Sequence, residues 1–123
     1  MAKVTSQRTP RRYLSRVLDR LQRIRQMLAE SPDDAFLRFA EAQELRKAGN
    51  LEDAAQKFEA LRALVPAYVG LYYHLAAVYV ELDNAAKAEE IYTTGIDVAQ
   101  SEGDQHALAE LRNAHMNWQL DMD

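Results

Sequence analysis

The chain has 123 residues, 48% of them hydrophobic and 28% charged, which is typical of one folded domain and excludes a chain disordered by composition. It has no cysteine, which excludes disulfide frameworks, thiolate zinc sites and cysteine nucleophiles, and its four glycines and three prolines favour helix over sheet. The net charge of −4 divides unevenly, since residues 1–30 hold eight Lys/Arg and two acids whereas the rest of the chain holds seven and seventeen.

The chain begins with a polar segment that leads into a helix. Residues 1–9 show no periodicity, so we expect a disordered tail without a secretion signal. From residue 10 to residue 30 apolar side chains recur at helical spacing, at Leu14, Val17, Leu18, Leu21, Ile24 and Leu28. This segment is predicted to be the first helix.

Cap and stop signals divide the rest of the chain into five more helices. Ser31 suits the N-cap and Pro32 the first position of a second helix, which Gly49 ends. Asn50 and Asn84 are further N-cap residues. The predicted helices cover residues 32–48, 51–64, 67–82, 85–101 and 104–120. Six helices with short turns predict an all-α array of antiparallel neighbours.

The sequence matches itself when it is shifted by 34 residues. The aligned residues are mostly of the small, aromatic, proline or cap types that close packing and turns constrain most. They are Pro32 with Pro66, Leu37 with Leu71, Ala42 with Ala76, Leu45 with Tyr79, Asn50 with Asn84, Ala54 with Ala88, Phe58 with Tyr92 and Leu64 with Val98. The same shift aligns Val17 with Leu51 and Ile24 with Phe58, so the first helix corresponds to the second helix of a repeat.

The second unit reads Tyr72-x-x-Leu75-Ala76-x-x-Tyr79, followed by Ala88-x-x-x-Tyr92. On these residues the chain resembles the tetratricopeptide repeat family, whose unit is a pair of helices. In the first unit, Arg38 stands where a large aromatic residue is usual, and Glu41 stands where leucine is usual. The resemblance implies one domain over residues 10–123, folded as a right-handed α-α superhelical array. Its parts are a half-repeat helix (10–30), repeat one (32–65), repeat two (66–101) and a capping helix (104–120).

No residue pattern indicates catalysis. His106 and Glu110 have the i,i+4 spacing of a metal-binding pair, but no third ligand is evident. With four glycines and no P-loop pattern, the chain lacks a phosphate-binding loop. We therefore predict that the protein is not an enzyme and has no metal site and no cofactor.

The resemblance also implies a groove, lined by the first helix of each repeat, that binds a peptide or a partner protein. The predicted groove residues are Phe36, Phe39, Gln43, Arg46, Gly70, Tyr73, Ala77 and Val80. Chaperone-binding members of the family grip a C-terminal carboxylate with Lys and Asn. Phe39, Gln43 and Ala77 occupy those places here, so we expect no such clamp. As an alternative, the last helix covers Tyr73 and Val80 and leaves only the two phenylalanines accessible.

The basic face of the first helix has three interpretations. Its arginines are Arg11, Arg12, Arg16, Arg20, Arg23 and Arg25. They meet the acidic body of the same molecule or of a neighbour, which is the interpretation we prefer. Alternatively, the apolar stripe of the helix fits the a and d positions of a coiled coil and forms a homodimer. The third interpretation, binding to nucleic acid or an anionic membrane, has no supporting motif.

The sequence therefore predicts a cytoplasmic, bacterial-type adaptor that binds an unidentified protein or peptide. Two alternatives stay open, namely a nucleic-acid-associated accessory protein that uses the Arg-rich helix and a self-associating structural subunit. No membrane span is expected, because the longest apolar run, Leu75 to Val80, is too short.

Overall fold

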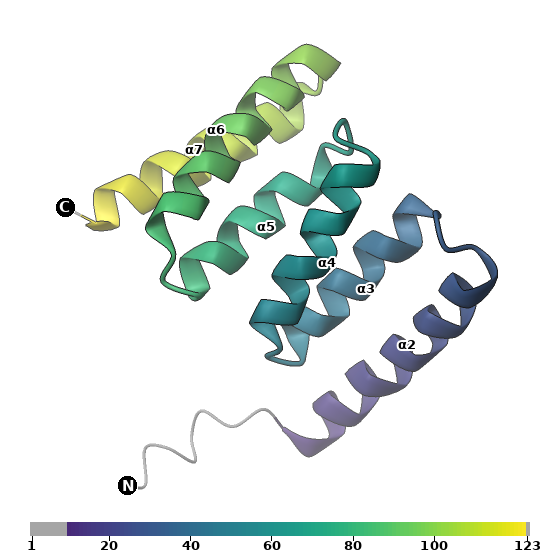
Figure 1. Cartoon of the computed structure of the whole chain (residues 1–123). Coiled ribbons are helices and arrows are strands. Elements are labelled where there is room, and N and C mark those ends of the chain that lie inside the picture. The colour runs from purple at the N-terminus through teal and green to yellow at the C-terminus, as the bar shows by residue number, and fades with distance from the viewer. Residues whose placement is uncertain (1–9, 123) are drawn as a thin grey trace, which may run out of the picture.

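A computed structural model describes residues 10–122 as six α-helices joined by short turns (Figure 1). The helices are α2 (Arg11–Glu30), α3 (Ala35–Lys47), α4 (Leu51–Leu64), α5 (Gly70–Glu81), α6 (Ala85–Glu102) and α7 (Gln105–Met122). The described residues contain no strand, so the predicted all-α class is confirmed. The tail expected over residues 1–9 lies outside the described residues.

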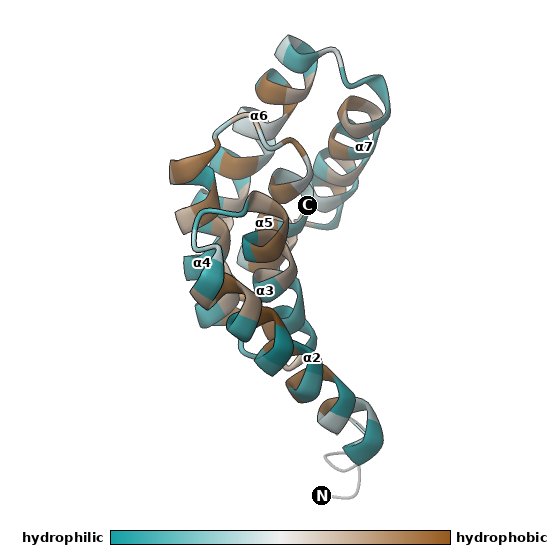
Figure 2. Ribbon diagram, turned by 90° about the vertical axis from the view of Figure 1, so that its right-hand side faces the viewer, coloured by the Kyte–Doolittle hydropathy of each residue, from teal (hydrophilic) through white to brown (hydrophobic). Residues whose placement is uncertain are grey.

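The helices form a curved array of two layers. α3, α5 and α7 make one layer and are called the A helices here, whereas α4 and α6, on the other side of the array in Figure 2, are B helices. α5 packs against both α3 and α7, but within residues 10–122 α4 does not pack against α6. Because the A helices approach one another more closely than the B helices, the A layer lies on the concave side.

Both A helices of the repeats begin three residues later than predicted. The assignment of Ser31 as N-cap is wrong, because Asp34 caps α3 and its side chain accepts a hydrogen bond from the amide of Leu37 at 3.0 Å. Pro32 lies instead in a turn in which the amide of Asp34 donates to the carbonyl of Ser31 at 3.1 Å, and Pro66 lies in the equivalent turn. Proline suits this turn position because its ring fixes φ at about −65°.

Arg38, which departs from the family pattern, makes the same hydrogen bond as its counterpart in the second repeat. Its Nε donates to the carbonyl of Pro32 at 2.7 Å, and the hydroxyl of Tyr72 donates to the carbonyl of Pro66 at 2.5 Å. The two donors are 34 residues apart, and so are the two acceptors. The side chain at this position therefore ties each A helix to the turn before it.

The core lies between the two layers. Its largest fully buried side chains are Leu45, Phe58, Leu61, Leu71, Tyr72, Leu75, Ile91 and Leu111. Gly95 of α6 marks a close approach to α5 and α7, because a Cβ there would lie 2.5 Å from Cβ of Tyr72 and 3.4 Å from Cδ1 of Leu111. A larger residue at this position would push α6 away from both neighbours.

α2 is attached to the array by its apolar stripe. Among the helices of residues 10–122 it packs against α3 alone. Val17 and Leu21 are buried in this contact, and Leu14, Ile24 and Leu28 are partly buried. The stripe that also fits a coiled-coil seam is therefore in use within the chain.

Two ion pairs reinforce the contact between α2 and α3. Nε of Arg25 lies 3.0 Å from Oε2 of Glu41, and Nη2 of Arg20 lies 3.1 Å from Oε1 of Glu44. Only 8% of the Glu41 side chain and 9% of the Glu44 side chain are exposed. Glu41, the second departure from the family pattern, is thus the partner of a basic helix at the position where the second repeat has the buried Leu75.

Candidate functional site

Two of the predicted groove residues on α3 and α5 are exposed aromatic side chains. Phe36 lies in the first turn of α3 and is 67% exposed, and Tyr73 lies in the first turn of α5 and is 38% exposed. Gly70 begins α5, and a Cβ built on it would meet only the ring of Tyr68, at 3.7 Å. The start of α5 is therefore open to the close approach of another backbone.

Phe39 supports this surface from within the array. Its ring centroid lies 5.9 Å from that of Phe58, 5.5 Å from that of Tyr68 and 5.5 Å from that of His74. Aromatic rings at these separations attract one another in edge-to-face or offset arrangements. Phe39 is partly buried as a result, so it holds α3, α4 and α5 together and offers less surface than its place on the helix suggests.

A polar cluster occupies the other end of the same surface. Nη2 of Arg46 lies 2.8 Å from Oε2 of Glu81 and so links α3 to α5. Nη1 of Arg46 and Nε2 of Gln43 each lie 3.5 Å from a ring nitrogen of His74. Arg46 and Gln43, both predicted groove residues, are therefore engaged with side chains of the next A helix.

His74 and Glu81 belong to this surface, although the sequence did not identify them. Partial burial, and then the neighbouring Arg46 guanidinium, lower the pKa of His74 below its ordinary value of 6.5, while Glu110 of α7 acts in the opposite direction. This environment therefore favours the neutral form of His74. The opposite charges of Arg46 and Glu81 at matching ends of two A helices were a signal for their pairing, whereas the position of His74 depends on how the helices pack.

The last helix limits access to the C-terminal part of the surface. α7 packs against α5, and both Ala77 and Val80 are partly buried. Tyr73 nevertheless keeps 38% of its surface exposed. The accessible part of the predicted groove is thus the region of Phe36, Gly70 and Tyr73.

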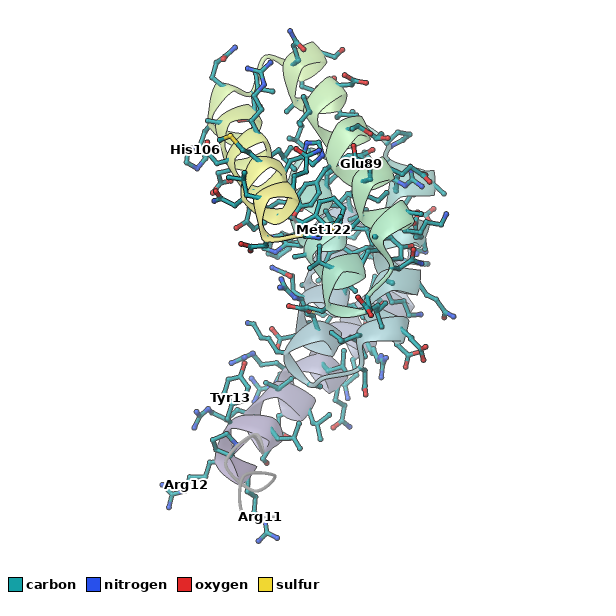
Figure 3. All side chains as sticks on the ribbon, turned by 90° about the vertical axis from the view of Figure 1, so that its left-hand side faces the viewer. Arg11, Arg12, Tyr13, Glu89, His106 and Met122 are labelled. Atoms are coloured by element: carbon teal, nitrogen blue, oxygen red, sulfur yellow. The ribbon has the colours of Figure 1, made fainter. Side chains whose placement is uncertain are left out.

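The arginines of the predicted basic face differ in their surroundings. Arg20 forms an ion pair with Glu44 of α3, and Arg25 forms one with Glu41 of the same helix. Arg11, Arg12, Arg16 and Arg23 are exposed, and they have no ion pair with any residue in the range 10–122. Arg11 and Arg12 point away from the molecule at the outer end of α2 (Figure 3).

The other histidines make pairs that need no metal. Nε2 of His115 lies 2.8 Å from Oε1 of Glu89 and joins α7 to α6, and the exposed His106 lies 3.6 Å from Glu110. In the part of the chain that the structure describes, no group of three or more metal-ligating side chains is found. None of the described helices is long and apolar enough to cross a membrane.

Comparisons with known proteins agree with the helix-pair architecture. The family model described as "Tetratricopeptide repeat" matches residues 45–111. No curated protein matches the chain.

Solved structures provide further relatives. A tetratricopeptide repeat domain protein from Salinibacter ruber is 44% identical in its solution structure, with a TM-score of 0.67 over 70% of this chain and 87% of that one. Its crystal structure gives a TM-score of 0.65 over 68% and 93%. A protein from Bordetella parapertussis, 24% identical, shares the fold with a TM-score of 0.74 over 82% of this chain and 88% of that one. The chain therefore belongs to the tetratricopeptide repeat family.

Proposed function

We propose that this protein is an adaptor that binds a peptide segment of a partner protein along the concave surface of α3 and α5. A large apolar side chain of the partner packs between Phe36 and Tyr73. The observation that supports the proposal is the exposure of two aromatic side chains, 67% and 38%, on the neighbouring helices α3 and α5. Tetratricopeptide repeat arrays generally mediate interactions between proteins, and their concave surfaces are extended binding sites.

Phe36 and Tyr73 would lose their contact with water when a ligand covers them. Aromatic anchors that become buried contribute most to binding energy, because they remove a large apolar area from water. Both are on helices whose positions are fixed by Phe39 and by the ion pair of Arg46 with Glu81, so little conformational entropy is lost on binding. Gly70 leaves room for the backbone of the peptide.

Selection of peptides from a displayed random library tests the proposal. The wild-type protein serves as the target, and the double variant Phe36→Ser/Tyr73→Ser serves for counter-selection. Both side chains are exposed, so we expect the variant to keep its helical circular dichroism. The matched control is Leu64→Ser, which removes an exposed apolar side chain (41% exposed) from a B helix.

We expect the selected peptides to share a large apolar residue. Their affinity should fall at least about tenfold for the double variant, which corresponds to the loss of one anchor, and should be unchanged for Leu64→Ser. Peptides that bind the double variant as well as the wild type, or the absence of any enriched peptide, would show that the concave surface is not the binding site.

A further inference from the structure

α2 occupies the place of a B helix, but within residues 10–122 it has one of the two A-helix neighbours that α4 and α6 have. α4 packs between α3 and α5, and α6 packs between α5 and α7. α2 packs against α3 only, within the described residues, and lies at the outer end of the array (Figure 1). The side on which the A helix of its own repeat would pack is therefore not covered by any described helix.

The 34-residue shift identifies the residues on this side. In α4 the ring of Phe58 packs against Phe39 of the A helix of the same repeat, and Ala54 and Leu61, which lie one turn away on the same side of the helix, are like Phe58 0% exposed. Their counterparts in α2 are Arg20, Ile24 and Met27. Met27 is 50% exposed, so an apolar residue is kept at a position that nothing in the described chain covers, and Ile24 at the edge of the contact with α3 is only partly buried.

Arginines surround these two apolar side chains. Arg12, Arg16, Arg23 and Met27 follow at intervals of four, seven and four residues, which places them on one side of the helix. The three arginines are exposed and have no ion pair within residues 10–122. Arg20 stands at the position of Ala54 in α4. Its long side chain keeps an apolar helix from approaching α2 as closely as α3 approaches α4.

We propose that this uncovered side of α2 is a docking surface for an acidic amphipathic helix of a partner protein. The apolar residues of that helix pack on Ile24 and Met27, and its carboxylates pair with Arg16 and Arg23. The partner helix completes the half-repeat and takes the place of an A helix. This surface is separate from the concave surface of α3 and α5, and the inference does not depend on the proposed function.

Charge argues against a second copy as the occupant. Two α2 helices side by side would bring arginine rows together, and like charges oppose such a contact. The A helix at the other end of the array, α7, offers a polar side to a B helix, because the 34-residue shift places His106, Glu110 and Asn113 at the positions of Tyr72, Ala76 and Tyr79. A repeat formed by α7 of one copy and α2 of another would therefore lack an apolar contact.

Helix geometry argues against a membrane surface. The exposed apolar residues of α2 are Leu18, 47% exposed, and Met27, 50% exposed. They are nine residues apart, which is about two and a half turns, so they lie on opposite sides of the helix. One membrane plane cannot receive both, and the main apolar stripe is occupied by α3.

A designed peptide probes the surface directly. The probe is a fluorescein-labelled helix of about 20 residues, long enough to be partly helical in water, with leucines at helical spacing and glutamates beside them. Two comparison peptides have the same composition in scrambled order and the same leucines with glutamine in place of glutamate. Binding to the full chain is measured by fluorescence anisotropy at low and high salt.

Four variants locate the binding site. We expect Arg16→Glu/Arg23→Glu and Met27→Asp to weaken binding of the acidic peptide at least about tenfold, as the loss of paired charges and an apolar contact requires. Arg112→Glu, the control on α7, should leave binding unchanged, because Arg112 is also exposed and α7 does not pack against α2. Phe36→Ser/Tyr73→Ser should also leave it unchanged, which separates this inference from the proposed function.

Several outcomes would overturn the inference. One is equal affinity for the acidic and scrambled peptides, and another is equal weakening by Arg112→Glu, since both would indicate unspecific charge attraction. Failure of the acidic peptide to bind the full chain would also overturn the inference. Tighter binding to duplex DNA or to phosphatidylserine vesicles, lost in Arg16→Glu/Arg23→Glu, would assign the arginines to phosphate groups. Concentration-dependent self-association, lost in the same variant, would assign the surface to a second copy.

Discussion

The close contact at Gly95 makes this residue sensitive to a single methyl group. We expect Gly95→Ala to destabilise the protein by about 1–3 kcal/mol, the usual cost of overpacking, even though alanine favours helix by about 1 kcal/mol. The cause is the distance of 2.5 Å between the added Cβ and Cβ of Tyr72, which is backbone-proximal and cannot turn away. Urea unfolding followed by circular dichroism measures the change.

Gly70→Ala is the matched control for this prediction. An added Cβ at Gly70 meets only the edge of the Tyr68 ring at 3.7 Å, so its effect should be neutral or slightly stabilising. Equal stability of Gly95→Ala and the wild type would mean that α6 lies farther from α5 than the structure shows.

At the scale of elements, α2 has a single described neighbour, α3, and two ion pairs join the two helices. We expect the amides of α2 to exchange with solvent faster than those of α4 and α6, because α2 packs on one side only. In the variant Arg20→Ala/Arg25→Ala the exchange rate of the α2 amides should rise by a further factor of about three to ten. This factor corresponds to the free energy lost with two partly exposed ion pairs. Hydrogen exchange followed by mass spectrometry resolves the segments.

The control for this prediction is Arg11→Ala/Arg12→Ala, which removes two arginines of α2 without an ion pair in the described chain. Its exchange should equal that of the wild type. If both pairs of substitutions raise exchange equally, the helix is stabilised by its overall composition and not by Glu41 and Glu44.

The elements also show how far sequence alone leads. The number and order of helices were predictable because caps and the 34-residue repeat are local signals. The starts of α3 and α5 were not, since proline suits both a helix start and a turn, and the choice depends on the hydrogen bonds that Arg38 and Tyr72 make to the turns. Exposure of Phe36 follows from projection on a helix. The roles of His74 and Glu81 do not follow from such a projection, because they depend on how α3 and α5 pack against each other.

For the whole molecule, the partly buried position of His74 makes stability depend on pH. Its pKa is below 6.5 in the folded state, so the unfolded chain binds a proton first as the pH falls. The contribution of His74 is therefore complete above pH 6.5 and is lost progressively as the pH drops below this value. Arg46 of α3 opposes the protonated form, and Glu110 of α7 favours it.

We expect His74→Gln to remove this part of the pH dependence. The free energy of unfolding of the wild type should fall more steeply between pH 7 and pH 5 than that of the variant, by the linkage of proton binding to unfolding. Urea titrations at several pH values give both curves. Parallel curves would mean that His74 has the same pKa in the folded and unfolded chain.

The one tryptophan of the chain gives the array an optical label at a single end. Trp118 of α7 stacks near Tyr92 of α6, with ring centroids 5.6 Å apart, and near His115 at 6.2 Å. Its emission therefore reports the docking of the last helix, whereas circular dichroism averages over all helices. Because each helix pair contacts only its neighbours, the array can lose its ends before its centre. Comparison of the two signals in one denaturant series thus separates fraying of the C-terminal end from collapse of the whole fold.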